Sequence, residues 1–245
     1  MVTKTKQMKW IDELSHKYYD SCLLIGSGAS LDHIPYADIC NMFYKDDLII
    51  CVNNMWMDEE IKYDYCINHH TIKDLPDKYL ELWQKDIYKN PYKHVLPEFD
   101  CNDERRGITQ MQGDFYKYKG MPVCESTKVF VKPIVEKIPN TLFVGGSILF
   151  DAIGLALHCG IKKFFLMGFD GGQFEGHSYY SKYRELWAED PYFVTGHSIR
   201  TMNSFKSLQE FLKPRGISFV HISARYGSSD LTYTNYEGHD YSVVL

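Results

Sequence analysis

The stretch Ser21-Cys-Leu-Leu-Ile-Gly-Ser-Gly-Ala-Ser30 joins a short apolar run to a glycine-containing turn. An apolar run of this length that ends at glycine is typical of a strand buried on both faces of a parallel sheet. Similar runs recur at residues 48–52, 63–67, 163–168 and 217–222, mostly with helical patterns between them. This alternation predicts an α/β fold, with a Rossmann-like, mostly parallel sheet flanked by helices.

The remaining segments are expected to complete one domain over residues 1–245. Apolar residues recur at helical spacing over 147–159 and 198–213, which predicts two helices. Residues 87–126 carry tyrosines, glycines and charges without a steady period, and this predicts an irregular insertion. A second such stretch, about 171–196, lies between a strand and a helix, where active-site lids commonly lie.

Charge and hydropathy limit the classes of partner. The 245 residues include 27 Lys and Arg against 32 Asp and Glu, a net charge of −5. This balance provides no strong field for nucleic acid or an anionic membrane, so we expect no nucleic-acid partner. The sequence contains no secretory signal pattern and no run long enough for a transmembrane segment, which predicts a soluble, cytoplasmic protein; peripheral contact with the inner membrane face stays open.

The turn after the first apolar run is a candidate phosphate site. Backbone N–H groups of Gly26, Ser27, Gly28 and Ser30, followed by a helix, could cradle a phosphate group. A dinucleotide dehydrogenase would have a third glycine where Leu31 stands and an acidic residue at the end of the second strand, and both are absent. The alternative is an ordinary glycine-rich connection between a strand and a helix.

Polar residues follow three further apolar runs. Asn53 and Asn68 come directly after the second and third runs, and Asp170 comes two residues after the run at 163–168. The carboxyl ends of parallel strands meet at one edge, where open α/β folds bind ligands. Amide groups suit a neutral base, a ribose or a sugar, whereas a tightly held divalent metal prefers carboxylates. Turn formation is the alternative role for each of these residues.

His197 is the candidate general base. It lies at or just before the start of a predicted helix, and a helix N-terminus keeps an imidazole neutral and able to accept a proton. A capping or structural histidine is the alternative. The sequence has no Gly-x-Ser-x-Gly elbow, no Walker A lysine and no pair of zinc-ligand motifs, so we expect neither covalent catalysis nor a metal site.

Together these positions resemble the bacterial sialyltransferases of the lipooligosaccharide type, together with the related flagellin-modifying nonulosonic acid transferases and hydroxymethylpterin diphosphokinase-like domains. Residues 25–31 are similar to that group's nucleotide-binding turn, and Gly168-Phe-Asp170 is similar to its Gly-hydrophobic-Asp segment. Gly146-Ser147, ahead of a helix, and Gly196-His197-Ser198 also resemble family segments. The resemblance covers two blocks, 21–70 and 140–225, and none of residues 71–139.

The resemblance implies a GT-A-type fold and a role for each matched residue. Asn53 and Asn68 would contact a CMP-activated sugar, His197 would be the catalytic base, and Tyr179 would lie near the transferred phosphate. The family's second phosphate-contacting tyrosine stands where this chain has Gly171 and another glycine, so Tyr180 or Tyr183 is the candidate replacement. An arginine that the family carries shortly before Gly146 is absent. The implied nucleotide-binding residues are Gly26, Ser27, Gly28, Ser30, Asn53, Asn68, Gly146, Ser147, Asp170 and Gly171.

The implied activity is transfer of sialic acid or a related nonulosonic acid from a CMP-activated donor to a glycan hydroxyl, as in lipopolysaccharide biosynthesis. No cofactor or essential metal is expected, Mg²⁺ binding stays open, and the related enzymes form homo-oligomers. Two alternatives remain. One is Mg²⁺-dependent diphosphoryl transfer from ATP to a pterin alcohol, with Asp170 as a metal ligand. The other is a catalytically silent nucleotide- or sugar-binding module.

Overall fold

The computed structural model describes residues 7–14, 19–44, 46–68, 77–97, 114–122, 138–144, 147–170, 177, 180–182 and 204–222. At its centre is β2 (Ser21–Ile25), which is buried along its whole length. Cys22 and Leu24 pack into one hydrophobic cluster, whereas Leu23 and Ile25 pack into another on the opposite face. An apolar run without alternation is what a strand covered on both faces requires.

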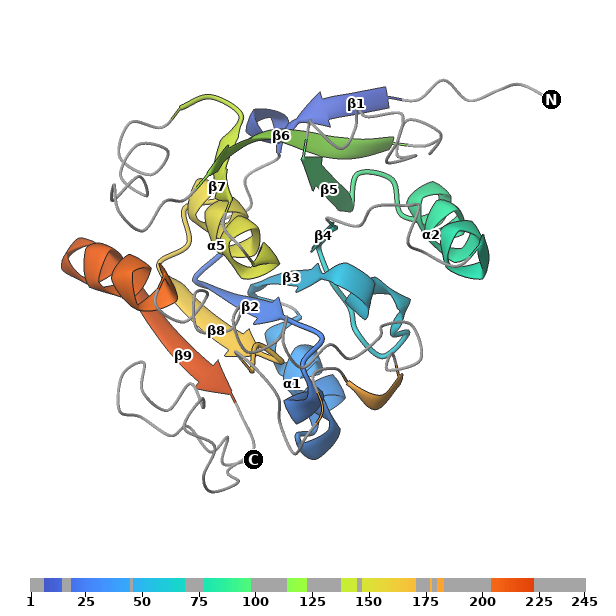
Figure 1. Cartoon of the computed structure of the whole chain (residues 1–245), viewed down its shortest axis with the longest axis horizontal. Helices are drawn as coiled ribbons and strands as arrows, with labels where there is room; N and C mark the ends of the chain where they lie inside the picture. Colours follow the sequence, from blue (N-terminus) through green and yellow to red (C-terminus); the bar gives the residue numbers. More distant parts are fainter. Residues whose placement is uncertain are drawn as a thin grey trace.

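The sheet is parallel throughout the described residues, and its strand order is β1-β6-β5-β4-β3-β2-β8-β9, with β7 paired to β6 (Figure 1). From β2 the chain adds strands outward on one side as far as β6. It then returns to place β8 and β9 on the other side of β2. The order therefore reverses between β2 and β8, and this reversal is the topological switch point of the sheet. The strands other than β2 are β1 (Gln7–Trp10), β3 (Leu48–Val52), β4 (Tyr65–Ile67), β5 (His94–Pro97), β6 (Asp114–Pro122), β7 (Thr141–Val144), β8 (Lys163–Met167) and β9 (Ser218–Ile222).

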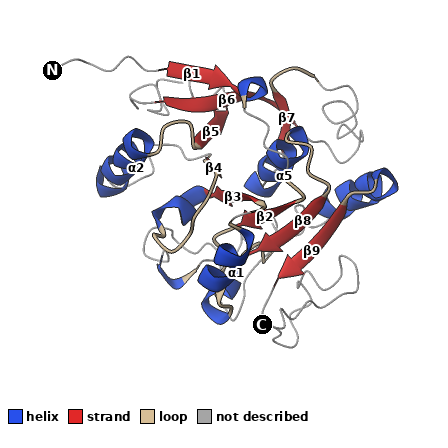
Figure 2. Ribbon diagram, turned by 180° about the vertical axis from the view of Figure 1, so that it is seen from behind, coloured by secondary structure: helices blue, strands red, loops and turns tan. Residues whose placement is uncertain are grey.

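Helices cover both faces of the sheet (Figures 1 and 2). On one face lie α5 (Ile148–His158) and a helix at residues 204–212, whose apolar side chains join the cluster around Leu24. On the other lie α1 (Tyr36–Phe43) and α2 (Asp77–Lys89), which join the cluster around Leu23. Short 3-10 helices complete the described elements: η1 (Ile11–Glu13), η2 (Ala29–His33), η3 (Asn53–Met57) and η8 (Lys213–Arg215).

The predicted α/β fold is confirmed, as are the strands at the five apolar runs and the helix over 147–159. The predicted helix over 198–213 is helical at 204–212, and its earlier part lies outside the described residues. The prediction of an irregular insertion over 87–126 is wrong for the residues described there. That range contains the end of α2, β5 and β6.

Candidate functional site

Two backbone hydrogen bonds join the turns that follow β2 and β8 at the switch point. The N–H of Gly26 donates to the carbonyl of Met167, and the N–H of Gly28 donates to the carbonyl of Gly168, both at 2.8 Å. A Cβ on Gly28 would lie 2.5 Å from Oδ2 of Asp170, and a Cβ on Gly26 would collide with the Gly168 carbonyl oxygen. Both glycines are therefore needed for space, because no side chain fits between two backbones this close.

The carboxylate of Asp170 occupies the start of η2. Its Oδ2 accepts the Ser30 N–H at 2.8 Å, and its Oδ1 accepts the Ser30 hydroxyl. Burial raises the pKa of Asp170, and the hydrogen bonds from Ser30 offset that rise only in part. This differs from the predicted phosphate cradle, in which the Ser30 N–H on the Gly26–Ser30 turn would be available to a ligand. The turn leads into a five-residue 3-10 helix, and the protein's own carboxylate accepts the Ser30 N–H.

Gly28→Ala tests this close approach. The added methyl group must displace the carboxylate of Asp170, so we expect the unfolding free energy to fall by about 1–3 kcal/mol. The measurement is chemical denaturation, with Ser27→Ala as control, because the Ser27 side chain has no hydrogen-bond partner among the described residues. Equal stability of the two variants would contradict the arrangement.

Asp170→Asn tests the charge at this position. Because burial raises the pKa of Asp170 in the folded state, its contribution to stability is greatest below the unfolded pKa of about 3.9 and is lost as pH rises through the folded pKa. The asparagine variant lacks this titration. Its stability relative to the natural chain should therefore improve between pH 4 and pH 7 in denaturation experiments. A constant difference across this range would show that the carboxylate does not titrate as the structure implies.

Residues 180–182 are tied to the turn after β2. The N–H of Tyr180 donates to the Ser27 carbonyl at 2.9 Å, and the Ser181 hydroxyl donates to Asp32 at 2.5 Å. The ammonium group of Lys182 lies 3.1 Å from a carboxylate oxygen of Asp58. Part of the predicted lid range thus lies against the carboxyl edge of β2.

The hydroxyl of Tyr36 is the hub of these contacts. It accepts hydrogen bonds from the Tyr180 hydroxyl at 3.0 Å and from Lys182 at 2.9 Å. It also lies 2.9 Å from Oδ2 of Asp58 and 2.7 Å from Oε2 of Glu60. Burial and these hydrogen bonds raise the pKa of Tyr36, while the hydrogen bonds from Tyr36 and Lys182 lower the pKa of Glu60. The Tyr180 hydroxyl, a predicted phosphate donor, is engaged by Tyr36, and the Tyr180 ring is buried.

Tyr36→Phe should loosen this attachment. The change leaves the buried carboxylate of Asp58 and the hydroxyl of Tyr180 short of one partner each, so we expect a loss of about 1–3 kcal/mol in unfolding free energy. The matched control is Tyr44→Phe, because the Tyr44 side chain is 48% exposed and forms no hydrogen bond among the described residues. Equal effects from the two changes would contradict the role of Tyr36 as the hub.

The two asparagines that follow β3 differ in their surroundings. Asn53 is half-buried, has a positive φ of 55°, and its side chain has no hydrogen-bond partner within the described part of the chain. Asparagine adopts this left-handed conformation more readily than most residues, so the turn itself favours Asn53. Asn54 is completely buried; its Oδ1 accepts from Tyr79, but its Nδ2 has no partner among the described residues. Asn54 is not among the predicted site residues, although it is adjacent to Asn53.

Asn68 follows β4 and is also completely buried. Its Nδ2 lies 3.3 Å from Sγ of Cys66 and 3.4 Å from Nδ1 of His94, whereas its Oδ1 has no partner in the described residues. The other ring nitrogen of His94 lies 2.7 Å from Asp86 on α2. Asn68 therefore belongs to a polar network in the core and retains one unused acceptor. Buried polar atoms without a partner are rare and call for an explanation.

Several predicted site residues lie outside the described part of the chain: Gly146, Gly171, Tyr179 and His197. Ser147 is described, and it caps α5 by accepting the Leu149 N–H at 3.3 Å. The structure therefore brings Gly26, Ser27, Gly28, Ser30 and Asp170 together at the switch point. Asn53 and Asn68 follow the neighbouring strands at the same carboxyl edge.

Over the described residues, no group of three or more His, Cys, Asp or Glu side chains has an arrangement that could hold a metal ion. A helix of the length and apolar character needed to cross a membrane is also absent from these residues.

No family model matches the sequence, and no curated protein matches it. Among solved structures, the chain is similar to a sialyltransferase from Campylobacter jejuni that was determined in complex with the substrate analogue CMP-3FNeuAc. The similarity covers 82% of this chain and 80% of that chain, with 13% sequence identity and a TM-score of 0.40. A likeness of this size assigns no function, which has to be argued from the residues themselves.

Proposed function

We propose that this protein is a glycosyltransferase that moves sialic acid or a related nonulosonic acid from a CMP-activated donor to a glycan hydroxyl without an essential metal. One observation carries the proposal. The carboxyl edge beside the switch point holds two buried amide atoms without a partner among the described residues, Nδ2 of Asn54 and Oδ1 of Asn68. Open α/β sheets bind ligands at this edge.

The unused atoms suit a neutral base or sugar. Nδ2 of Asn54 is a donor and Oδ1 of Asn68 is an acceptor, so a ligand that presents both kinds of group would satisfy them. Cytosine presents an amino donor beside acceptor atoms, and a sugar hydroxyl can act as both. Asn53, the half-buried residue at the end of β3, adds an amide without a charge. Other groups bind the phosphate, because the N–H and the hydroxyl of Ser30 at the start of η2 already donate to Asp170.

The proposed mechanism uses two residues whose roles come from the resemblance to the sialyltransferases. His197 takes the proton from the acceptor hydroxyl, and Tyr179 donates a hydrogen bond to the departing phosphate. Positioned donors that stabilise developing charge supply the larger part of the rate enhancement. A general base contributes about 10²–10⁴ in rate. Tyr180, with its hydroxyl on Tyr36, anchors the segment next to Tyr179.

His197→Ala tests the proposed base. We expect the rate of transfer from CMP-sialic acid to fall by about 10²–10⁴, because a general base is lost, while the affinity for CMP in calorimetry stays within twofold. The control is His177→Ala, since His177 is exposed. Asn53→Gly, which removes the amide and still adopts the positive φ, should instead weaken CMP binding. Absence of CMP binding at millimolar concentration in the natural chain would overturn the proposal.

The same assays separate the alternatives. A diphosphokinase would consume ATP in the presence of Mg²⁺, and Asp170 would be its metal ligand. Both oxygens of Asp170 accept hydrogen bonds from Ser30, which weighs against that role. A silent binding module would bind CMP tightly yet release no sugar from CMP-sialic acid after prolonged incubation.

A further inference from the structure

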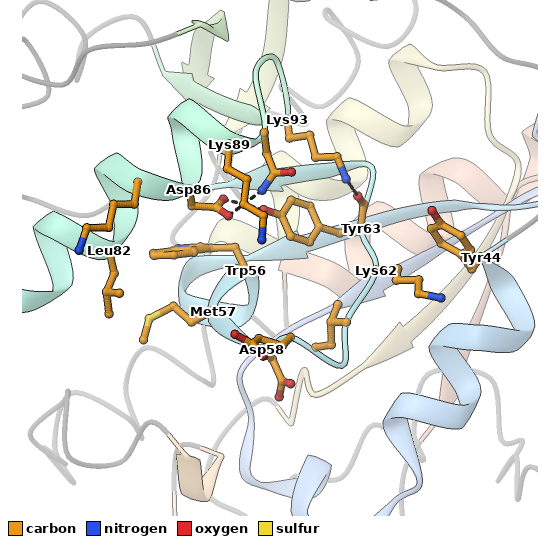
Figure 3. A pocket seen from close by; sticks show the side chains of 14 residues that line it. Tyr44, Trp56, Met57, Asp58, Lys62, Tyr63, Leu82, Asp86, Lys89 and Lys93 are labelled. Carbon is orange, nitrogen blue, oxygen red and sulfur yellow. Dashed lines mark hydrogen bonds between the residues drawn. The ribbon is translucent and has the colours of Figure 1, made fainter.

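A pocket of about 570 Å³ lies between η3 and α2, on the face of the sheet that α1 and α2 cover (Figure 3). Its size falls within the range of small-molecule sites. The residues that line it come from the end of α1, from η3, from the segment between η3 and β4, from α2 and from the connection between α2 and β5. None of them is a predicted nucleotide-binding residue, although Trp56 and Met57 share η3 with Asn53 and Asn54, so the pocket neighbours the proposed nucleotide site without sharing a residue with it.

Four lysines line this pocket: Lys62, Lys85, Lys89 and Lys93. Lys85 and Lys89 are four residues apart on α2 and therefore share a face of that helix. Among the described residues none of the four forms an ion pair with a carboxylate; Lys93 donates instead to the backbone carbonyl of Tyr63 at 2.6 Å. Several ammonium groups around one cavity, without acidic partners, favour an anionic ligand.

Two of the three acidic groups in the lining are already engaged within the protein. Asp86 accepts hydrogen bonds from Tyr63 and Asn90, each at 2.7 Å, and contacts His94 at the same distance. The hydrogen bonds to Asp86 outweigh its burial and lower its pKa. Asp58 is paired with Lys182, outside the lining. Only the third, Glu59, has no such partner in the described residues, so positive charge predominates in the pocket.

The rest of the lining is aromatic and apolar. Trp56 and Tyr63 form part of the wall, together with Met57 and Leu82 (Figure 3). Trp56 is 7% exposed, and its indole N–H has no hydrogen-bond partner among the described residues. The wall thus contains a buried donor to which the described residues offer no acceptor, beside a surface suited to a flat ring.

We propose that this pocket binds a small organic phosphate. The flat or apolar body of the ligand packs against Trp56 and Met57, and its phosphate group lies among Lys85, Lys89 and Lys93. A dianionic phosphate satisfies several ammonium groups at once, whereas a neutral sugar would leave them without counter-charge. The pocket is a second ligand site, beyond the transferase site.

The test is calorimetric titration of the full chain with phenyl phosphate, which combines an aromatic ring with one phosphate group. We expect binding at one site per chain. The double variant Lys85→Gln/Lys89→Gln should weaken it about fivefold to thirtyfold, because two charge-assisted contacts near the surface are lost. The matched control, Lys78→Gln/Lys206→Gln, removes the same charge from exposed lysines outside the lining and should leave the affinity within twofold.

Three outcomes would overturn the proposal: no binding of phenyl phosphate at millimolar concentration, equal weakening in the two double variants, or equal affinity for phenyl phosphate and inorganic phosphate. The last result would show that the apolar wall takes no part. Asn53→Gly separates this site from the proposed transferase site, because glycine removes the amide and still adopts the positive φ at this position. That change should leave phenyl phosphate binding intact, whether or not the protein transfers a sugar.

Discussion

The contact between the turns after β2 and β8 determines how the rest of the edge is built. Two backbone hydrogen bonds join these turns, and the carboxylate of Asp170 reaches across to Ser30. The distances leave no room for a side chain at Gly26 or Gly28. The two halves of the sheet are therefore joined by backbone at the point where the strand order reverses. A rigid contact of this kind suits the floor of a ligand site, because bound groups need fixed partners.

This contact also determines which groups remain for a ligand. Because Asp170 accepts the Ser30 N–H, the start of η2 carries a negative charge of its own. In the proposed transferase, recognition depends on neutral amide groups after β3 and β4, where buried atoms of Asn54 and Asn68 have no partner among the described residues. The segment at 180–182 lies against the same turn through Tyr36 and Ser27. These features favour a ligand that is recognised through hydrogen bonds and not through charge alone.

The sequence predicts the central strands well because they are covered on both faces and consist of apolar runs. It fails for β6, where the buried Tyr116 and Tyr118 alternate with Lys117 and Lys119, and for β5, which has only four residues. The edge positions of Asn53, Asn68 and Asp170 follow from strand ends and are predictable. Their hydrogen-bond partners are not, since the partner of Asp170 is 140 residues away in the chain. Asn54 was missed because sequence spacing does not indicate which of two adjacent amides is buried.

The two faces of the sheet differ in a way that explains where a second pocket can form. The face under α5 is packed mainly with apolar side chains, Leu24 and Phe219 among them, and it also holds the buried hydrogen bond from Tyr118 to Asp151 of α5. Under α2, the buried His94 contacts Asp86 of the helix and Asn68 after β4, and these contacts tie the helix to the sheet. Polar contacts fix distances between elements without filling the space beside them, whereas apolar packing closes it. A cavity with aromatic walls and lysines at its rim is therefore compatible with the polar contacts under α2.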